Sequence, residues 1–200
     1  VIYLLAYRDG VVGTRLILIG IGIAAMLDSV VAYLIVRAAA WDLPTAMRWL
    51  TGSLNGALWT QVLPLAIALA VAAPILLSQS RGLELLQHGD DSAAALGVPV
   101  ERTRLLSIIT AVALIAFATA AAGPIAFVAL LAPQIALRLA GTAVPTPLVS
   151  GVIGASLVLG GDLLVRTVLP GGLPVGIVTA AIGGPFLIYL MIVMSRKASV

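Results

Sequence analysis

The chain has 200 residues, of which 62% are hydrophobic and 10% are charged, and its formal net charge at pH 7 is +3. Soluble domains carry about 25% charged residues, so this composition excludes an ordinary soluble protein, and the small net charge argues against a nucleic-acid surface. The chain has no cysteine and one histidine, which excludes disulfides and leaves too few ligands for a cysteine or histidine metal site. Long apolar runs without alternation predict an all-α, polytopic helical membrane protein.

The predicted elements are mostly membrane spans. Val1–Tyr7 has no initiator Met and no basic signal-peptide region, and we interpret it as the end of a helix whose beginning is missing. About 20 apolar residues cross the hydrocarbon core. On this basis six spans follow, of which the fourth is short: Leu16–Val36, Leu58–Leu77, Leu105–Ala122, Ile125–Leu139, Pro147–Val165 and Leu173–Met194.

Basic residues predict the orientation, because Lys and Arg are enriched on the cytoplasmic side. Placing the polar segment Arg81–Arg104 in the cytoplasm puts eight basic residues inside and three outside. The outer three are Arg37, Arg48 and Arg166. The connection Arg37–Ala57 is then external, and its tryptophans, with Trp59, form an aromatic belt.

The segment Arg81–Arg104 holds seven of the 19 Asp, Glu, Lys and Arg residues and the only histidine. We expect two short helices in it, Leu83–His88 and a second one ending at Leu96. The residues expected to start or stop them are Gly89, Asp90, Asp91, Ser92, Gly97 and Pro99. A loop without a partner is the alternative, but so well-defined a pattern favours a contact surface for a partner protein.

Two acidic side chains in the apolar runs could have functional roles. Asp28 lies in the middle of a span, where a carboxylate costs roughly 2.5–3.5 kcal/mol on insertion scales, so it either faces a substrate pathway or is a structural, hydrogen-bonded group. Asp162 and Arg166 have the i, i+4 spacing of an ion pair, although Arg166 could instead meet a partner's carboxylate. Gln61 could hydrogen-bond a substrate or simply lie at a polar mouth. His88 is interpreted as a solvated loop residue.

The single lysine, Lys197, does not stand in a Gly-x-x-x-x-Gly-Lys-[Ser/Thr] motif. This chain therefore cannot bind ATP through a P-loop, and energy from ATP would have to enter through another subunit.

Several ordered motifs run along the chain. They are AGPIAFVALLAPQIALR at 122–138, GGDLLVR at 160–166 and LPVGIVTAAIGGPFL at 173–187, with shorter ones at 15–20, 49–54 and 96–104. Together they resemble the FecCD-type permeases, which are the membrane subunits of binding-protein-dependent ABC importers for ferric siderophores, haem and vitamin B12.

The resemblance implies one transmembrane permease domain over residues 1–200, forming the C-terminal part of a ten-span subunit in a bacterial cytoplasmic membrane. It implies partners: ABC ATPases, which would bind the ATP and Mg, a second permease subunit (identical or different), a substrate-binding protein and membrane lipid. No cofactor is expected in this chain. Residues 83–97 correspond to the helices that couple to the ATPase; the coupling candidates are Leu83, Leu86, Gly89, Asp90, Asp91, Ala94, Leu96 and Gly97.

The resemblance also assigns other roles. The spans beginning near Leu16 and Leu173 would line the pathway, with Asp28, Gln61 and Thr179 as candidates, and Arg48 and Arg166 would dock the binding protein. The expected function is import of a ferric siderophore by alternating access, without catalysis in this chain. The alternatives are an ion-coupled secondary transporter, an intramembrane enzyme and a non-transporting fragment.

Overall fold

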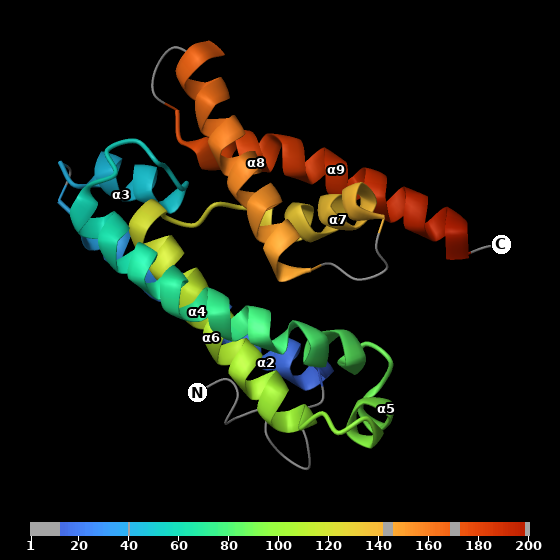
Figure 1. The fold of residues 1–200 in the computed structure, drawn as a ribbon. Helices are drawn as coiled ribbons and strands as arrows, with labels where there is room; N and C mark the ends of the chain where they lie inside the picture. The colour runs from blue at the N-terminus through green and yellow to red at the C-terminus, as the bar shows by residue number, and fades with distance from the viewer. Residues whose placement is uncertain (1–12, 40, 142–145, 169–172, 199–200) are drawn as a thin grey trace. The chain divides into compact units, whose positions relative to one another are not determined.

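The computed structural model describes residues 13–39, 41–141, 146–168 and 173–198. Every regular element within these ranges is helical, which confirms the all-α prediction (Figure 1). The helices are α2 Gly13–Arg37, α3 Leu43–Leu50, α4 Trp59–Leu86, α5 Asp90–Ala95, α6 Val100–Ala122, α7 Val128–Ala140, α8 Pro147–Val168 and α9 Val175–Ala198. The predicted helical stub Val1–Tyr7 lies outside the described residues.

Four of these helices are long and apolar enough to cross a membrane: α2 from Ile17 onward, α4, α6 and α8. α7 is shorter than a full span. α9 has 24 residues, and its sequence stays largely apolar from Val175 through Met194. All six predicted spans therefore coincide with helices. α4 continues beyond the predicted end at Leu77 to Leu86. The connection Arg37–Ala57, which was predicted to be external, contains α3, a helix that the sequence pattern did not predict.

Contacts divide the chain into two units at Met47 and Arg48, and each is described by itself. In the first unit α2 is a single helix whose large apolar side chains are exposed. In the second unit α4 packs along α6, while α7, α8 and α9 pack together. Figure 1 shows α5 joining the adjacent ends of α4 and α6.

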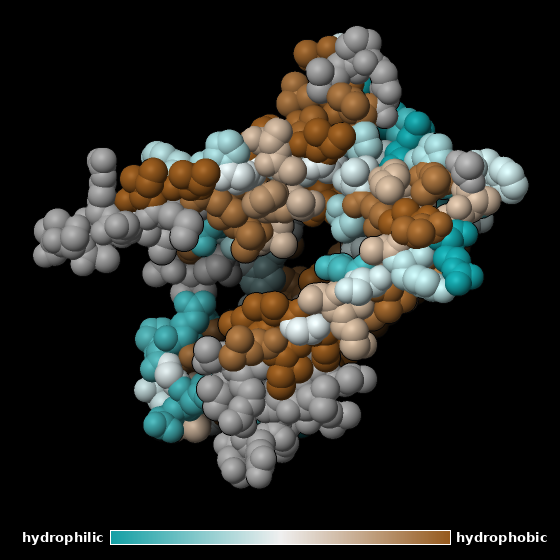
Figure 2. Space-filling model, turned by 180° about the vertical axis from the view of Figure 1, so that it is seen from behind, coloured by the Kyte–Doolittle hydropathy of each residue, from teal (hydrophilic) through white to brown (hydrophobic). Residues whose placement is uncertain are grey.

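Small residues allow the close approach of α7, α8 and α9. A Cβ at Gly154 of α8 would lie 3.5 Å from the Ala132 Cβ of α7, and a Cβ at Gly161 would lie 3.1 Å from the Val175 Cγ2 of α9. Helices in lipid gain little from burying apolar surface against one another, so close packing at small residues holds them together. Large apolar side chains remain exposed along the outer faces, drawn in brown in Figure 2.

Candidate functional site

The polar end of the α4–α6 pair is built around α5. α4 runs without interruption to Leu86, so the separate helix predicted over Leu83–His88 is wrong: these residues form the last turn of α4 and the turn after it. The chain reverses at Gly89, whose φ of 103° favours glycine. Gly89 is the N-cap of α5, and no side chain caps the helix. The predicted capping role of Asp90, Asp91 or Ser92 is therefore also wrong.

The end of α5 is a Schellman motif. The Gly97 N–H donates to the Ala94 carbonyl at 2.9 Å, and the Val98 N–H donates to the Ala93 carbonyl at 3.0 Å. Gly97 has a φ of 84°, which this motif needs. The prediction that Gly97 ends the second helix is confirmed.

Asp90 fastens α5 to α6. The Arg104 Nη2 lies 2.9 Å from both carboxylate oxygens of Asp90, and Ala93, which belongs to α5, is fully buried. The neighbouring stretch of α4 is tied to α6 as well, because the Ser107 hydroxyl donates to the Gln79 Oε1 at 2.9 Å. α5 is therefore fixed to its neighbours by specific contacts and is not a loose loop.

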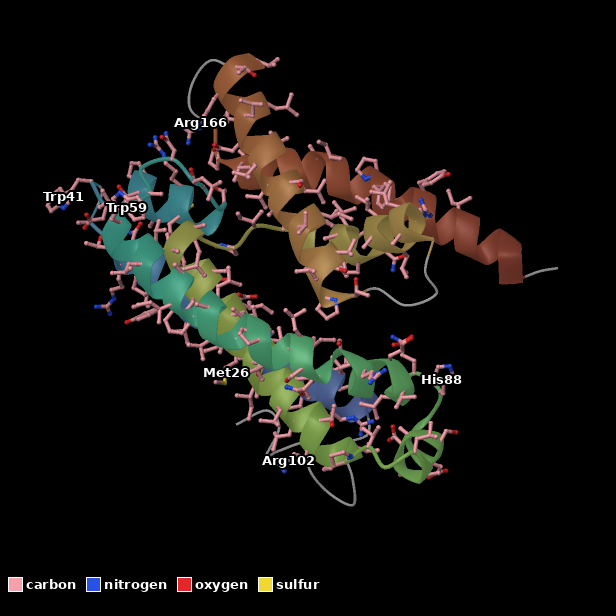
Figure 3. The ribbon with its side chains drawn as sticks, viewed as in Figure 1. Met26, Trp41, Trp59, His88, Arg102 and Arg166 are labelled. Carbon is pink, nitrogen blue, oxygen red and sulfur yellow. The ribbon has the colours of Figure 1, made fainter. Side chains whose placement is uncertain are left out.

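The outer surface of α5 is mixed in character. Leu96 is 67% exposed, and Asp91, Ala94 and Gly97 are exposed beside it, whereas Leu83 and Leu86 are half-buried. We call this set, from Leu83 to Gly97, the α5 surface. Figure 2 shows hydrophilic residues gathered at this end of the helix pair, and Figure 3 labels His88 and Arg102 on its two sides. An exposed leucine beside acidic groups suits a protein contact.

No group of His, Cys, Asp and Glu suited to a metal ion occurs among the described residues.

The three pathway candidates lie on separate helices. Asp28 is exposed on α2, and Gln61 is exposed in the first turn of α4. Thr179 on α9 is only 5% exposed, and its hydroxyl donates to the Gly176 carbonyl at 3.1 Å.

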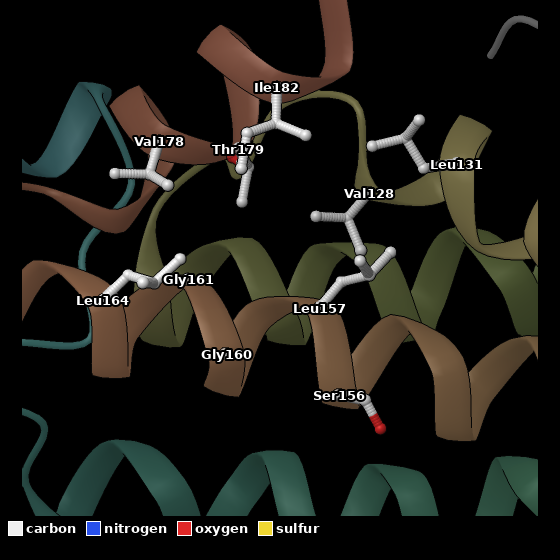
Figure 4. A pocket seen from close by; sticks show the side chains of 10 residues that line it. All are labelled: Val128, Leu131, Ser156, Leu157, Gly160, Gly161, Leu164, Val178, Thr179 and Ile182. Atoms are coloured by element: carbon white, nitrogen blue, oxygen red, sulfur yellow. The ribbon is translucent and has the colours of Figure 1, made fainter. Parts of the chain in front are cut away.

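Thr179 also lines a cavity of about 360 Å³ between α7, α8 and α9. Figure 4 shows that its walls are otherwise almost entirely apolar, with Val128, Leu157 and Ile182 among the lining residues. A cavity with this lining suits an apolar occupant better than an ionic chelate.

The two arginines predicted to dock a binding protein are both exposed. Arg166, labelled in Figure 3, donates from Nε to the Asp162 Oδ2 at 2.6 Å, which confirms the ion pair expected from their spacing. Its side chain is still 54% exposed, so the remaining guanidinium N–H groups can reach another carboxylate. Arg48 lies on α3.

A junction of glycines, which the sequence reasoning missed, joins the chain after α3 to α6 and α9. A Cβ at Gly123 would collide with the Trp49 carbonyl oxygen, and one at Gly176 would collide with that of Thr51. The Ser53 N–H donates to the Ala122 carbonyl at 2.8 Å, and the Gly176 N–H to the Gly52 carbonyl at 3.0 Å. The Gly123–Pro124 pair before an unusually short span was the available signal.

This chain is similar in sequence and in fold to known permease proteins. The model of the FecCD transport family matches residues 1–193. The ferric enterobactin transport system permease protein FepG of Escherichia coli (strain K12) is 46% identical over 200 residues, covering 98% of this chain and 60% of that protein. The iron(3+)-hydroxamate import system permease protein FhuG of Bacillus subtilis (strain 168) is 38% identical, covering 95% and 57%.

A solved structure assigned to the metal-chelate type of ABC transporter, in an inward-facing conformation, has a TM-score of 0.85 to this chain at 29% identity. The match covers 95% of this chain and 61% of the solved one. The chain thus spans about three fifths of the length of the relatives that it matches.

Proposed function

Because this chain belongs to the FecCD transport family, we propose that it forms part of the permease subunit of an ATP-driven importer for a ferric siderophore. The proposal places it in the cytoplasmic membrane of a bacterium. Relatives named for ferric enterobactin, iron(3+)-hydroxamate and Fe(3+)-citrate support an iron-chelate substrate.

The observation that carries the proposal is the ordered α5 surface. A salt bridge between Asp90 and Arg104, a buried Ala93 and a Schellman motif hold a short helix at the polar end of two spans. A held helix can transmit a displacement to α4 and α6, whereas a loose loop would absorb it. We propose that an ABC ATPase binds this surface and supplies the ATP–Mg chemistry.

In the proposed mechanism, the ATPases bind the two permease conformations with different affinity, and ATP binding shifts the permease between them. A second permease subunit completes the conduit. A substrate-binding protein delivers the chelate at the opposite end, where Arg48 and Arg166 would receive it.

The test is assembly and uptake of the full-length permease with its ATPase, comparing the wild type with the double variant Asp90→Lys/Ala94→Glu. The double variant breaks the ion pair with Arg104 and places a carboxylate on the exposed face. We expect loss of ATPase copurification and of ATP-dependent ferric siderophore uptake. Asn55→Glu is the matched control, because it puts the same side chain at an exposed position near the other end of α4.

Unchanged assembly and uptake in the double variant would show that the ATPase does not bind at α5. Uptake that survives removal of the ATPase would instead favour an ion-coupled secondary transporter, in which Asp28 would be the first residue to substitute.

A further inference from the structure

The chain between α6 and α7 does not form a helix but runs as an extended segment, residues 123–127, visible as the yellow strand-like trace joining them in Figure 1. We propose that this 123–127 segment lines a water-filled part of the translocation conduit, where its main-chain groups meet water and oxygen-rich solute. The proposal rests on the transport function proposed above and assigns a lining to that conduit.

The segment reaches the middle of the membrane. Its first residue, Gly123, lies against the Trp49 carbonyl at one end of α6. Its far end leads into Val128, which contacts α8 at Gly154, where an added Cβ would lie 3.7 Å from the Val128 Cγ1. Gly154 is about 20 Å along the helix axis from the end of α8 at Val168, at 1.5 Å per residue. Non-helical backbone therefore occurs at the depth of the hydrocarbon core.

Three backbone N–H groups of the segment lack a protein partner, although the carbonyls of Ala126 and Phe127 accept hydrogen bonds from the first turn of α7. Among the described residues, the N–H groups of Ile125, Ala126 and Phe127 have no hydrogen-bond acceptor. Irregular backbone at membrane depth is tolerated only where protein buries it or where it lines a water-filled cavity, because lipid offers no hydrogen bonds. Pro124 and Ala126 are exposed, so no described part of this chain buries them, and the proposal takes the water-filled alternative.

Both ends of the segment are fixed, so its exposure is built into the fold. At one end, a Cβ at Gly52 would lie 2.6 Å from the Pro124 carbonyl oxygen. At the other, Phe127 has a φ of 67°, and its side chain presses directly on Gly183 of α9. A bulky residue adopts this left-handed backbone conformation only when the surrounding structure imposes it. The segment between these anchors cannot fold away into a helix.

The test uses the absence of cysteine from this chain. Ala126→Cys is introduced into the full-length permease, freed of other cysteines and assembled with its ATPase in vesicles. A membrane-impermeant, charged thiol reagent is applied to both sides, without nucleotide and after trapping with vanadate. Val112→Cys is the matched control, because Val112 is 59% exposed on the helical middle of α6, which needs no water.

We expect Ala126→Cys to react at least tenfold faster than Val112→Cys in one of the two states. Equal, slow labelling of both variants in both states, with full reaction after denaturation, would overturn the proposal by showing that protein or lipid covers the segment. If Ala126→Cys does not assemble, Pro124→Cys tests the same segment, since Pro124 is also exposed.

Uptake of ferric siderophore is measured separately, so the two proposals can fail separately. Reactive Ala126→Cys, together with no ATP-dependent uptake by the permease that keeps Ala126, would support a water-filled conduit and reject the importer assignment. Normal uptake with an unreactive Ala126→Cys would reject the lining and leave the importer assignment intact.

Discussion

At the level of single residues, the packing depends on which glycines face a neighbour. Gly183 and Gly184 are adjacent on α9 but have opposite surroundings. A Cβ at Gly183 would collide with the Cβ and lie 2.6 Å from the Cγ of Phe127, whereas a Cβ at Gly184 would meet nothing within 4 Å. The Phe127 atoms in question are close to the backbone, so the ring cannot simply rotate out of the way.

We predict that Gly183→Ala destabilises the protein by about 1–3 kcal/mol, the usual cost of overpacking. Gly184→Ala should be neutral, or stabilising by up to about 1 kcal/mol through its higher helix propensity. The measurement is the apparent melting temperature of the purified full-length permease in detergent. Similar shifts for the two variants would contradict the contact between Phe127 and α9.

The sequence could show where glycines lie but not what they face. The motif at 173–187 contains Gly176, Gly183 and Gly184, and nothing in it distinguishes the two that contact other segments from the one that does not. Phe127 is the same case: a left-handed backbone at a phenylalanine is set by its tertiary surroundings and leaves no local sign.

At the level of elements, the polar segment was predicted partly correctly. The stop at Gly97 followed from local chemistry and is confirmed. The break before Leu83 was wrong because no proline follows Pro74 in α4 and its one late glycine, Gly82, is packed against Thr103 and Val98. A helix continues when its hydrogen bonds can be extended and nothing interrupts them. Asp90 was expected to cap the helix, but its carboxylate accepts a hydrogen bond from Arg104, 14 residues away. The local sequence pattern does not reveal this pairing.

The conformation at Gly97 makes a test of α5 possible. Ala at this position would carry a side chain at a φ of 84°, at a cost of roughly 1–2 kcal/mol, with no steric clash because nothing lies within 4 Å. We predict that Gly97→Ala accelerates hydrogen exchange of the Gly97 and Val98 amides by about fivefold or more, since those two bonds close the motif.

Gly97→Asn is the control for this prediction, because asparagine tolerates the left-handed region better than alanine. It should restore slow exchange in part. Equal exchange rates in the wild type and in Gly97→Ala would mean that the Schellman motif does not hold the end of α5.

At the level of the whole molecule, composition and span length were enough for the fold class, because lipid permits few ways of satisfying a backbone. They were not enough for the arrangement of the helices. Faces that pack on protein and faces that meet lipid are both apolar, so the grouping of α7, α8 and α9 could not be read from periodicity. The polar residues of α5 could be recognised from the sequence as a candidate site. The 123–127 segment could not, because its character depends on backbone geometry.

The two ends of the molecule are proposed to meet different partners, and Arg166 tests the end opposite α5. Its Nε is engaged by Asp162, which orients the guanidinium while more than half of the side chain stays exposed. In the assembled full-length transporter, Arg166→Glu should weaken docking of the substrate-binding protein about tenfold or more, because the new carboxylate would repel a carboxylate of the partner. Docking is measured by surface binding at low and high salt.

Two further variants separate charge from shape at this position. Arg166→Lys keeps the charge and should retain most of the affinity, whereas Thr167→Glu adds a carboxylate at the neighbouring exposed residue and should weaken docking less than Arg166→Glu. Exposed charges are screened by salt, so the difference between wild type and Arg166→Glu should shrink as salt rises. A difference that does not depend on salt would point to a folding defect, and unchanged docking at every salt concentration would remove Arg166 from the contact.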